Sequence, residues 1–225
     1  MILEPSPNFD DREAPVSMLV LHYTGMQSAR GAIDRLTSPD AKVSSHYVVD
    51  EDGTVYALVP EDKRAWHAGV SFWRGQRHLN GVSVGIEIVN PGHEWGYRPF
   101  PAVQMQAVLA LSRGILTRHA IPARNVVAHS DIAPDRKQDP GELFDWKFLA
   151  AQGVGLWTEA FAPPGDWRAD LALIGYDMSL PTQDVLLAFQ RHFLPLHLTG
   201  QADAPTTGRA AALRRLLVDA PDEQP

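Results

Sequence analysis

The chain contains no cysteine among its 225 residues. Disulfide bonds and thiolate metal ligands are therefore both excluded, and any metal ion must be held by His, Asp or Glu. The sequence also lacks a run of about 18 apolar residues, so no transmembrane helix is predicted. A formal net charge of −7 argues against a general nucleic-acid binder, which would usually be basic. With 44% hydrophobic and 21% charged residues, the composition is that of a soluble globular protein.

The N-terminal segment, MILEPSPNFDDREAP, lacks the basic start and apolar core of a secretory signal. We therefore expect a cytoplasmic protein, with a periplasmic or envelope location as the alternative if a leader has been removed. The length allows one well-developed hydrophobic core and a smaller second unit.

Short apolar runs alternate with amphipathic stretches over the first two thirds of the chain. Residues 46–59 have the pattern of a hairpin, with Asp52-Gly53 supplying the turn. Further strands are predicted at 16–23, 82–89 and 125–130, and helices at 28–36 and 101–119. This order predicts an α/β fold with a central mixed β-sheet flanked by helices, in which functional side chains lie at strand ends and in the following loops.

The composition changes near Pro163-Pro164-Gly165, which is typical of a linker or boundary. Beyond it, residues 170–177, 182–195 and 208–219 are predicted to form three short helices with a small shared core. We therefore predict two domains, at residues 1–160 and 166–222. A unit as small as residues 166–222 is marginally stable alone and would dock on the larger N-terminal domain.

Candidate metal ligands lie in the segment HSDIAPDRKQD, which runs from His129 to Asp139 and includes Lys137. A second histidine, His22, stands at the end of the apolar run LVLHYT. Two imidazoles and one carboxylate can hold Zn²⁺ with one coordination position open, as a hydrolytic zinc enzyme requires. Glu87 is a lone acid on the apolar strand VGIEIVN, where burial of an unpaired carboxylate is costly.

These segments resemble the zinc-dependent N-acetylmuramoyl-L-alanine amidases of the type-2 amidase family, which also includes the peptidoglycan recognition proteins. The resemblance covers residues 16–150 and is strongest with the branch that trims cell-wall fragments during recycling. The matching segments are LVLHYTG, VSSHYVVDEDGTVYALVPEDKRAWHAG, SVGIEIVN and VVAHSDIAPDRKQDPG. The C-terminal part is similar to the three-helix peptidoglycan-binding module often found beside such amidases.

The resemblance gives each candidate residue a role. His22, His129 and Asp139 are predicted zinc ligands, Glu87 the general base and Lys137 the group that holds the oxyanion. The alternative for Glu87 is a structural ion pair, and for Lys137 a solvated loop cation. Five further residues are predicted to contact the substrate: His46, Trp66, His67, Arg74 and Asn90. Trp66 could equally pack in the core.

The predicted function is zinc-dependent hydrolysis of the amide between N-acetylmuramic acid, in the 1,6-anhydro form, and L-alanine in soluble muropeptides. One alternative is an envelope amidase that acts on intact peptidoglycan. Another is a recognition protein without catalysis, although members of that kind have lost a zinc ligand and this chain keeps all three. The sequence leaves open the oligomeric state, and whether residues 69–81 form a lid or an ordinary surface loop.

Overall fold

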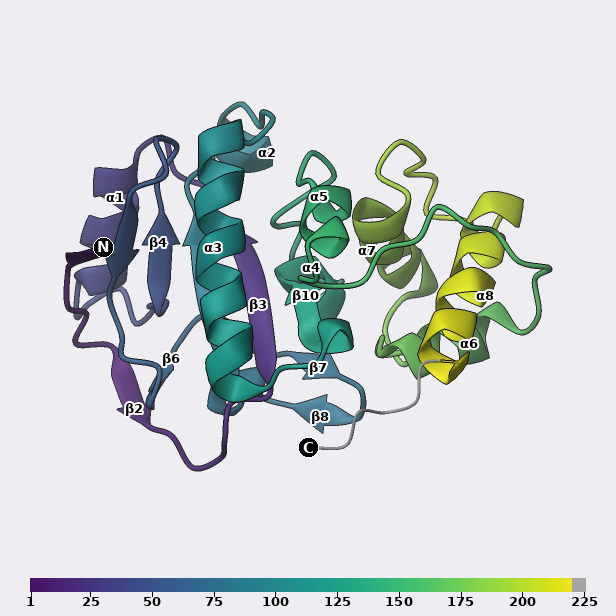
Figure 1. The fold of residues 1–225 in the computed structure, drawn as a ribbon, viewed down its shortest axis with the longest axis horizontal. Coiled ribbons are helices and arrows are strands. Elements are labelled where there is room, and N and C mark those ends of the chain that lie inside the picture. Colours follow the sequence, from purple (N-terminus) through teal and green to yellow (C-terminus); the bar gives the residue numbers. More distant parts are fainter. Residues whose placement is uncertain (220–225) are drawn as a thin grey trace.

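The computed structural model describes residues 1–219. Its centre is a six-stranded mixed sheet with the strand order β1-β5-β4-β9-β3-β10 (Figure 1). The central strands β3 and β9 are buried almost throughout. Strands β4 and β5 pair antiparallel, and every other neighbouring pair in this sheet is parallel. The strands are β1 (Ile2–Leu3), β3 (Met18–Tyr23), β4 (Tyr47–Val49), β5 (Val55–Ala57), β9 (Ser83–Ile88) and β10 (Val126–Ala128).

Two small antiparallel pairs lie outside this sheet. They are formed by β2 (Phe9–Asp11) with β6 (Lys63–Ala65), and by β7 (Phe72–Trp73) with β8 (Gln76–Arg77). The helices are α1 (Ala29–Thr37), α2 (Gly92–Trp95), α3 (Ala102–His119), α4 (His129–Ile132), α5 (Trp146–Ala151), α6 (Trp167–Ile174), α7 (Thr182–Phe193) and α8 (Ala204–Asp219). Short 3-10 turns occupy Leu79–Gly81 and Ala123–Asn125. No helix in residues 1–219 is long and apolar enough to cross a membrane.

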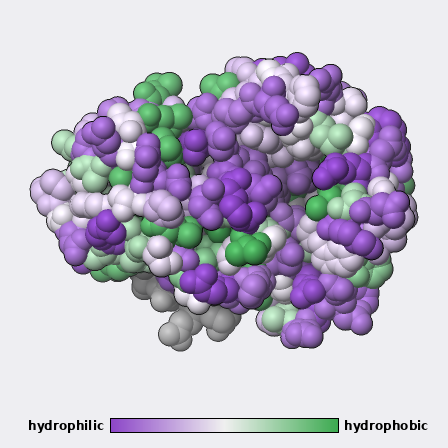
Figure 2. All heavy atoms as spheres, turned by 180° about the vertical axis from the view of Figure 1, so that it is seen from behind, coloured by the Kyte–Doolittle hydropathy of each residue, from purple (hydrophilic) through white to green (hydrophobic). Residues whose placement is uncertain are grey.

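The two faces of the sheet have different coverings. Alternate residues of a strand point to opposite faces, so Leu19 and Leu21 of β3 pack with α3, which lies in front of the sheet in Figure 1. Met18 and Val20 point the other way, into a core that they share with α6, α7 and α8. Hydrophilic side chains cover most of the molecule's surface when it is seen from behind (Figure 2).

The predicted fold class is confirmed: a mixed central sheet is flanked by helices and followed by three C-terminal helices. One strand prediction is wrong at its end, because β10 stops at Ala128 and His129 begins α4. The Asp131 carboxylate accepts a hydrogen bond from the Ala128 amide at 2.8 Å and so stabilises a helical turn where a strand was expected. The division into two domains stays a prediction, and residues 220–222 lie outside the described part.

Residues 69–81 form the β7–β8 hairpin and its flanking turns, which pack against the C-terminal helices. Trp73 is buried, with its ring 5.1 Å from that of Tyr176. The Arg74 amide donates to the Gly175 carbonyl at 2.9 Å, and Arg77 pairs with Asp177. These contacts favour a fixed surface hairpin over a lid.

Candidate active site

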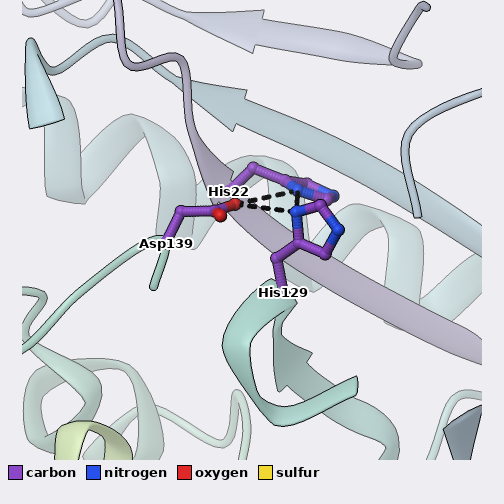
Figure 3. Close-up of side chains that lie close together, drawn as sticks. All are labelled: His22, His129 and Asp139. Carbon is purple, nitrogen blue, oxygen red and sulfur yellow. Dashed lines mark hydrogen bonds and ion pairs between the residues drawn. The ribbon is translucent and has the colours of Figure 1, made fainter. Parts of the chain in front are cut away.

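His22, His129 and Asp139 converge although they come from three separate elements (Figure 3). His22 lies near the end of β3, His129 is the first residue of α4, and Asp139 lies in the loop that follows α4. Each of the three side chains is at least nine-tenths buried. The two Nδ1 atoms are 2.9 Å apart, and Asp139 Oδ2 lies 3.2 Å from that of His22 and 3.0 Å from that of His129.

This triangle of donor atoms fits a metal ion. Tetrahedral zinc with bonds of about 2.0 Å separates its ligand atoms by roughly 3.3 Å, close to the spacing found here. The outer nitrogen of His129, Nε2, donates to the Ala68 carbonyl at 3.3 Å, which leaves a lone pair on its Nδ1. Burial, reinforced by the neighbouring His129, lowers the pKa of His22 to about 4, so His22 is neutral at pH 7. These three residues can therefore hold a metal cation.

Asp139 supplies the negative charge of the cluster. Burial alone would raise the pKa of its carboxyl group, but the two adjacent imidazoles outweigh this and lower the pKa far below the ordinary value. The carboxylate is therefore ionised at neutral pH. Two neutral imidazoles and one carboxylate give a donor set with a single negative charge, which suits a divalent ion that must remain Lewis acidic.

Glu87 lies beside His22 on the neighbouring strand. The two residues are paired in the parallel register of β3 and β9, so their side chains leave the sheet on the same face. Glu87 Oε2 is buried and has no hydrogen-bond partner among the described residues. Burial, reinforced by the Asp139 charge, raises the pKa of Glu87 well above its ordinary value, and Lys137 opposes that shift. An unpartnered buried carboxyl group at this position is suited to proton transfer.

A cavity of about 380 Å³ opens in front of these groups. Glu87, His129, Lys137 and Asp139 line it, as do Trp66 and His67 from the predicted substrate-binding set. Its volume suits a small organic ligand. Other lining residues come from the end of β3, from α1 and from the loops after β3, α1 and α4: Tyr23, Thr24, Gly25, Met26, Ala32, Arg35, Leu36, Val43, Ser44, Arg136 and Gln138.

Trp66 and His67 both reach the cavity but are held differently. Trp66 is half-buried, and its indole Nε1 donates to Asp10 at 2.6 Å, which fixes the ring beside the opening. His67 is buried, with Nδ1 3.0 Å from His22 Nε2 and Nε2 3.1 Å from the Ser83 hydroxyl. His67 therefore contacts a candidate metal ligand as well as the cavity.

The structure places the other three predicted substrate contacts away from the cavity. His46 is fully buried, accepts from the Gly85 amide through Nδ1 and lies against Arg12 and the Lys63 carbonyl through Nε2. Asn90 bridges the Arg98 carbonyl and the Gly92 amide. Arg74 lies on the β7–β8 turn and donates to the Leu173 carbonyl. Their hydrogen bonds within the fold account for these residues without a substrate.

Several residues near the site were not predicted from the sequence. Arg35 of α1 adds a cationic side chain to the cavity wall, beside Arg136 and Lys137, and Tyr23, which follows His22, also lines the wall. Ser83 contacts His67, and Asp131 accepts from the amide of Ala128, the residue before His129. Tyr23 could have been found because it directly follows a ligand. The contacts of Arg35, Ser83 and Asp131 depend on tertiary packing that carries no local sequence signal.

Two imidazoles and a carboxylate that could hold a metal ion, beside a buried carboxyl group at one cavity, are the groups that a hydrolase with a single metal ion would need. The family described as N-acetylmuramoyl-L-alanine amidase matches residues 12–142, more than half of the chain. The chain belongs to this family and is therefore an enzyme of the amidase class.

Individual relatives agree with the family match. The chain is 41% identical to the N-acetylmuramoyl-L-alanine amidase AmiD of Escherichia coli, over 88% of this chain and 82% of AmiD. The 1,6-anhydro-N-acetylmuramyl-L-alanine amidase AmpD of E. coli is 35% identical over 63% of this chain and 86% of AmpD.

Two solved structures with bound ligands are also similar. One is AmiD in complex with the substrate anhydro-N-acetylmuramic acid-L-Ala-D-γ-Glu-L-Lys, at a TM-score of 0.78 and 38% identity, covering 91% of both chains. The other is AMPDH3 of Pseudomonas aeruginosa in complex with an anhydromuramic pentapeptide, at a TM-score of 0.81 and 32% identity, covering 90% of this chain and 92% of that one.

Proposed function

We propose that this enzyme is a zinc-dependent amidase that hydrolyses the bond between the lactyl group of N-acetylmuramic acid, in its 1,6-anhydro form, and L-alanine. The observation that carries the proposal is the convergence of His22, His129 and Asp139 beside the unpartnered carboxyl group of Glu87. The bound ligands of AmiD and AMPDH3, both anhydromuramic peptides, support the choice of substrate. A role in recycling muropeptides is consistent with this substrate class.

Zinc is the proposed metal because the donor set is two nitrogens and one oxygen within a compact triangle. Hard cations such as Mg²⁺ and Ca²⁺ prefer oxygen ligands, whereas imidazole suits zinc. When bound, zinc supplies Lewis acidity and lowers the pKa of water to about 7. His22, His129 and Asp139 would hold the ion and leave its cavity-facing side open.

Glu87 is proposed as the proton carrier of the reaction. Its carboxylate takes a proton from the attacking water and gives it to the nitrogen of the departing L-alanine. The two transfers need a group whose pKa lies near the working pH, and the raised pKa of Glu87 brings it closer to that range. Its place next to His22 across two central strands gives the carboxyl group a fixed position.

Lys137 is proposed to stabilise the oxyanion that develops on the scissile carbonyl. Its side chain lines the same cavity as Glu87, and its backbone amide donates to the Ala133 carbonyl at 3.0 Å, which holds the loop that also carries Asp139. A cation fixed at that wall stabilises negative charge more strongly than a solvated one because the site excludes water.

The charges around the cavity suit an acidic peptide. Arg35, Arg136 and Lys137 lie on its wall, and a muropeptide stem carries free carboxylates. Trp66 provides a fixed aromatic surface at the opening, where a sugar ring can stack. We propose that these groups orient a soluble muropeptide so that its lactyl amide lies between Glu87 and Lys137.

Mass-spectrometric product analysis tests this proposal. The wild type should release free peptide from anhydro-muramoyl tripeptide, and a chelator should stop the release. The Glu87→Gln variant should lose at least about a hundredfold in turnover while its measured zinc content stays unchanged. Substantial turnover by that variant would refute the role assigned to Glu87.

Intact peptidoglycan, assayed in parallel, separates the alternatives. Release from the soluble fragment alone supports an amidase of recycled muropeptides. Release from the polymer as well would favour an enzyme of the envelope. Binding of the fragment without release, in a zinc-loaded protein, would support a recognition protein and contradict the proposed catalysis.

We also propose that residues 1–160 form the amidase domain and 166–222 a helical unit that supports it. The shared core supports this reading: Met18 and Val20 of β3 pack with Leu171 of α6 and Phe189 of α7. A unit docked through a common hydrophobic core contributes stability whether or not it also binds cell-wall polymer. Deletion of residues 166–225 should therefore cause loss of cooperative unfolding rather than loss of polymer binding alone.

A further inference from the structure

A chain of hydrogen bonds runs away from the metal-facing side of His22 into the fold. His22 Nδ1 faces His129 and Asp139, and its other ring nitrogen, Nε2, lies 3.0 Å from His67 Nδ1. His67 Nε2 lies 3.1 Å from the Ser83 hydroxyl, and that hydroxyl donates to the Leu79 carbonyl at 2.7 Å. The chain therefore links a ring nitrogen of His22 to a backbone carbonyl through two side chains.

The direction of each hydrogen bond follows from its last member. A carbonyl only accepts, so the Ser83 hydroxyl uses its single hydrogen on Leu79. The Ser83 oxygen must then accept from His67 Nε2–H, which leaves the neutral His67 ring with an acceptor at Nδ1. His22 must in turn donate from Nε2–H. The hydrogen of His22 is thus on the outer nitrogen, and the lone pair is on Nδ1.

We infer that His67 and Ser83 are positioning residues that fix the tautomer and the ring orientation of His22, so that its Nδ1 lone pair always faces His129 and Asp139. With Nε2–H of His129 donating to Ala68, three lone pairs then meet with no hydrogen between them. A metal cation bound by all three atoms relieves this arrangement. Outer partners of this kind raise metal affinity by orienting the ligand before the ion arrives.

The neighbouring residues restrict the position of the His67 ring. A Cβ atom at position 85 would come within 2.5 Å of the ring atoms Cγ and Nδ1, so β9 needs glycine where the imidazole crosses it. The His67 and Ala68 amides both donate to Asn80 Oδ1, at 3.1 and 2.7 Å, which fixes the backbone of the turn. The ring planes of His22 and His67 meet at 87°, so the edge of one ring faces the other.

The inference rests on the proposed metal site, and nitrogen-15 NMR of the metal-free wild type tests it without any substitution. We expect His22 and His67 both to carry hydrogen on Nε2, with the His67 Nδ1 signal of a hydrogen-bond acceptor. A His22 ring with its hydrogen on Nδ1, or an equal mixture of tautomers, would overturn the inference.

Variants of similar size then separate orientation from packing. His67→Leu removes the acceptor and should weaken zinc binding about 10- to 100-fold in competition with a chromophoric chelator. His67→Asn keeps an acceptor oxygen near the position of Nδ1 and should bind zinc several-fold more tightly than His67→Leu. Ser83→Ala should bind zinc more weakly than wild type, and its His22 ring should no longer prefer one tautomer. Ser83→Thr keeps the hydroxyl, so its zinc affinity and its His22 tautomer should match those of wild type.

His46→Gln is the matched control, because His46 is a buried histidine whose ring lies 5.7 Å from that of His67 and takes part in none of the three hydrogen bonds that link His22, His67, Ser83 and Leu79. It should lower stability yet leave the His22 tautomer and zinc affinity unchanged. Zinc affinity of His67→Leu within about twofold of wild type, with the fold intact by circular dichroism, would contradict the inference.

Failure of the proposed function would look different from failure of this inference. A wild type that binds zinc with the expected tautomers but releases no peptide refutes the amidase proposal alone. A wild type that releases peptide, beside variants with unchanged zinc affinity and tautomer, refutes the positioning role alone.

Discussion

The site has two walls, and they are supported in different ways. The sheet wall carries His22 and Glu87 on neighbouring central strands, where backbone pairing sets their spacing. The loop wall carries His129, Lys137 and Asp139 on α4 and the segment after it, with only one short helical turn of regular structure. The three candidate metal ligands come from both walls. Their relative positions therefore depend on strand pairing in the sheet and also on the contacts that hold the loop.

The loop wall takes its rigidity from the C-terminal part of the chain. Asp131 of α4 accepts hydrogen bonds from Tyr176 at 2.6 Å and from His192 of α7 at 2.7 Å, in addition to the Ala128 amide. Asp131 lies two residues beyond His129, so these bonds hold the turn that presents the ligand. Among the described residues, those of the C-terminal helices therefore help to position the turn that carries His129, although none of them lines the cavity.

Loss of a metal ligand from either wall should have the largest effect. His22→Ala and His129→Ala should each lower turnover at least about a thousandfold, because the ion supplies most of the Lewis acidity and water activation. Zinc content per protein, measured by elemental analysis, should fall in both. A variant that keeps full zinc and most of its turnover would show that its wall does not supply a ligand.

Lys137→Met should have the next largest effect and leave the metal in place. Removal of one oxyanion stabiliser lowers kcat about 10²- to 10³-fold. Methionine keeps the length and the packing of the side chain, so zinc content and thermal unfolding should stay close to wild type. An unchanged kcat would return Lys137 to the role of a solvated loop cation.

Low pH should lower the free energy of unfolding through Glu61, on the sheet side of the molecule. Glu61 joins Tyr47 of β4 to Arg118 and His119 of α3. Burial alone would raise the pKa of Glu61, but hydrogen bonds from Arg118, Tyr47 and His119 outweigh it and lower the pKa to about 2. The stabilisation is therefore complete above the ordinary value of 4.5 and is lost as pH falls from 4.5 towards 2. It amounts to at most about 3 kcal/mol.

Denaturant unfolding between pH 6 and pH 2 measures this contribution. Glu61→Gln should be less stable than wild type at pH 6, and the difference should shrink as the pH approaches 2. A difference that stays constant across the window would show that folding does not lower the pKa of Glu61.

A matched pair of tyrosines gives the smallest effect and the sharpest comparison between walls. Tyr176 and Tyr47 each donate to a carboxylate at 2.6 Å, to Asp131 on the loop side and to Glu61 on the sheet side. Replacement of either by Phe should lower the free energy of unfolding by about 1.5–2 kcal/mol. Only Tyr176→Phe should also weaken zinc binding, and equal zinc affinity in the two variants would break the comparison.

The central strands could be predicted from the sequence because their apolar runs are long and buried on both faces. The shortest strands, such as β2 and β7, could not, since pairs of two or three residues form only where tertiary contacts bring them together. The hydrogen bonds of His46 and Asn90 could not be predicted for a related reason: their polar groups are satisfied by backbone atoms that no local pattern reveals. Their contacts with the substrate stay a prediction.

The ligand set followed from residue type and from the family pattern, whereas its support did not. Tyr176 and His192 lie 45 and 61 residues from Asp131 in the sequence, so only the fold shows that they meet. The same is true of His67 and Ser83, each of which makes a side-chain contact with no sequence motif of its own. Short motifs in the sequence thus identify the candidate reactive residues. The contacts that hold those residues in position can be seen only in the folded structure.

Anomalous diffraction from zinc-loaded crystals, recorded on both sides of the zinc absorption edge, tests the central claim most directly. We expect one strong peak in contact with His22 Nδ1, His129 Nδ1 and Asp139 Oδ2, where the two walls meet. A zinc peak elsewhere, or a histidine that binds zinc through Nε2, would contradict the proposed ligand set. The same conclusion would follow if a variant that lacks one of the three residues still bound zinc at full occupancy.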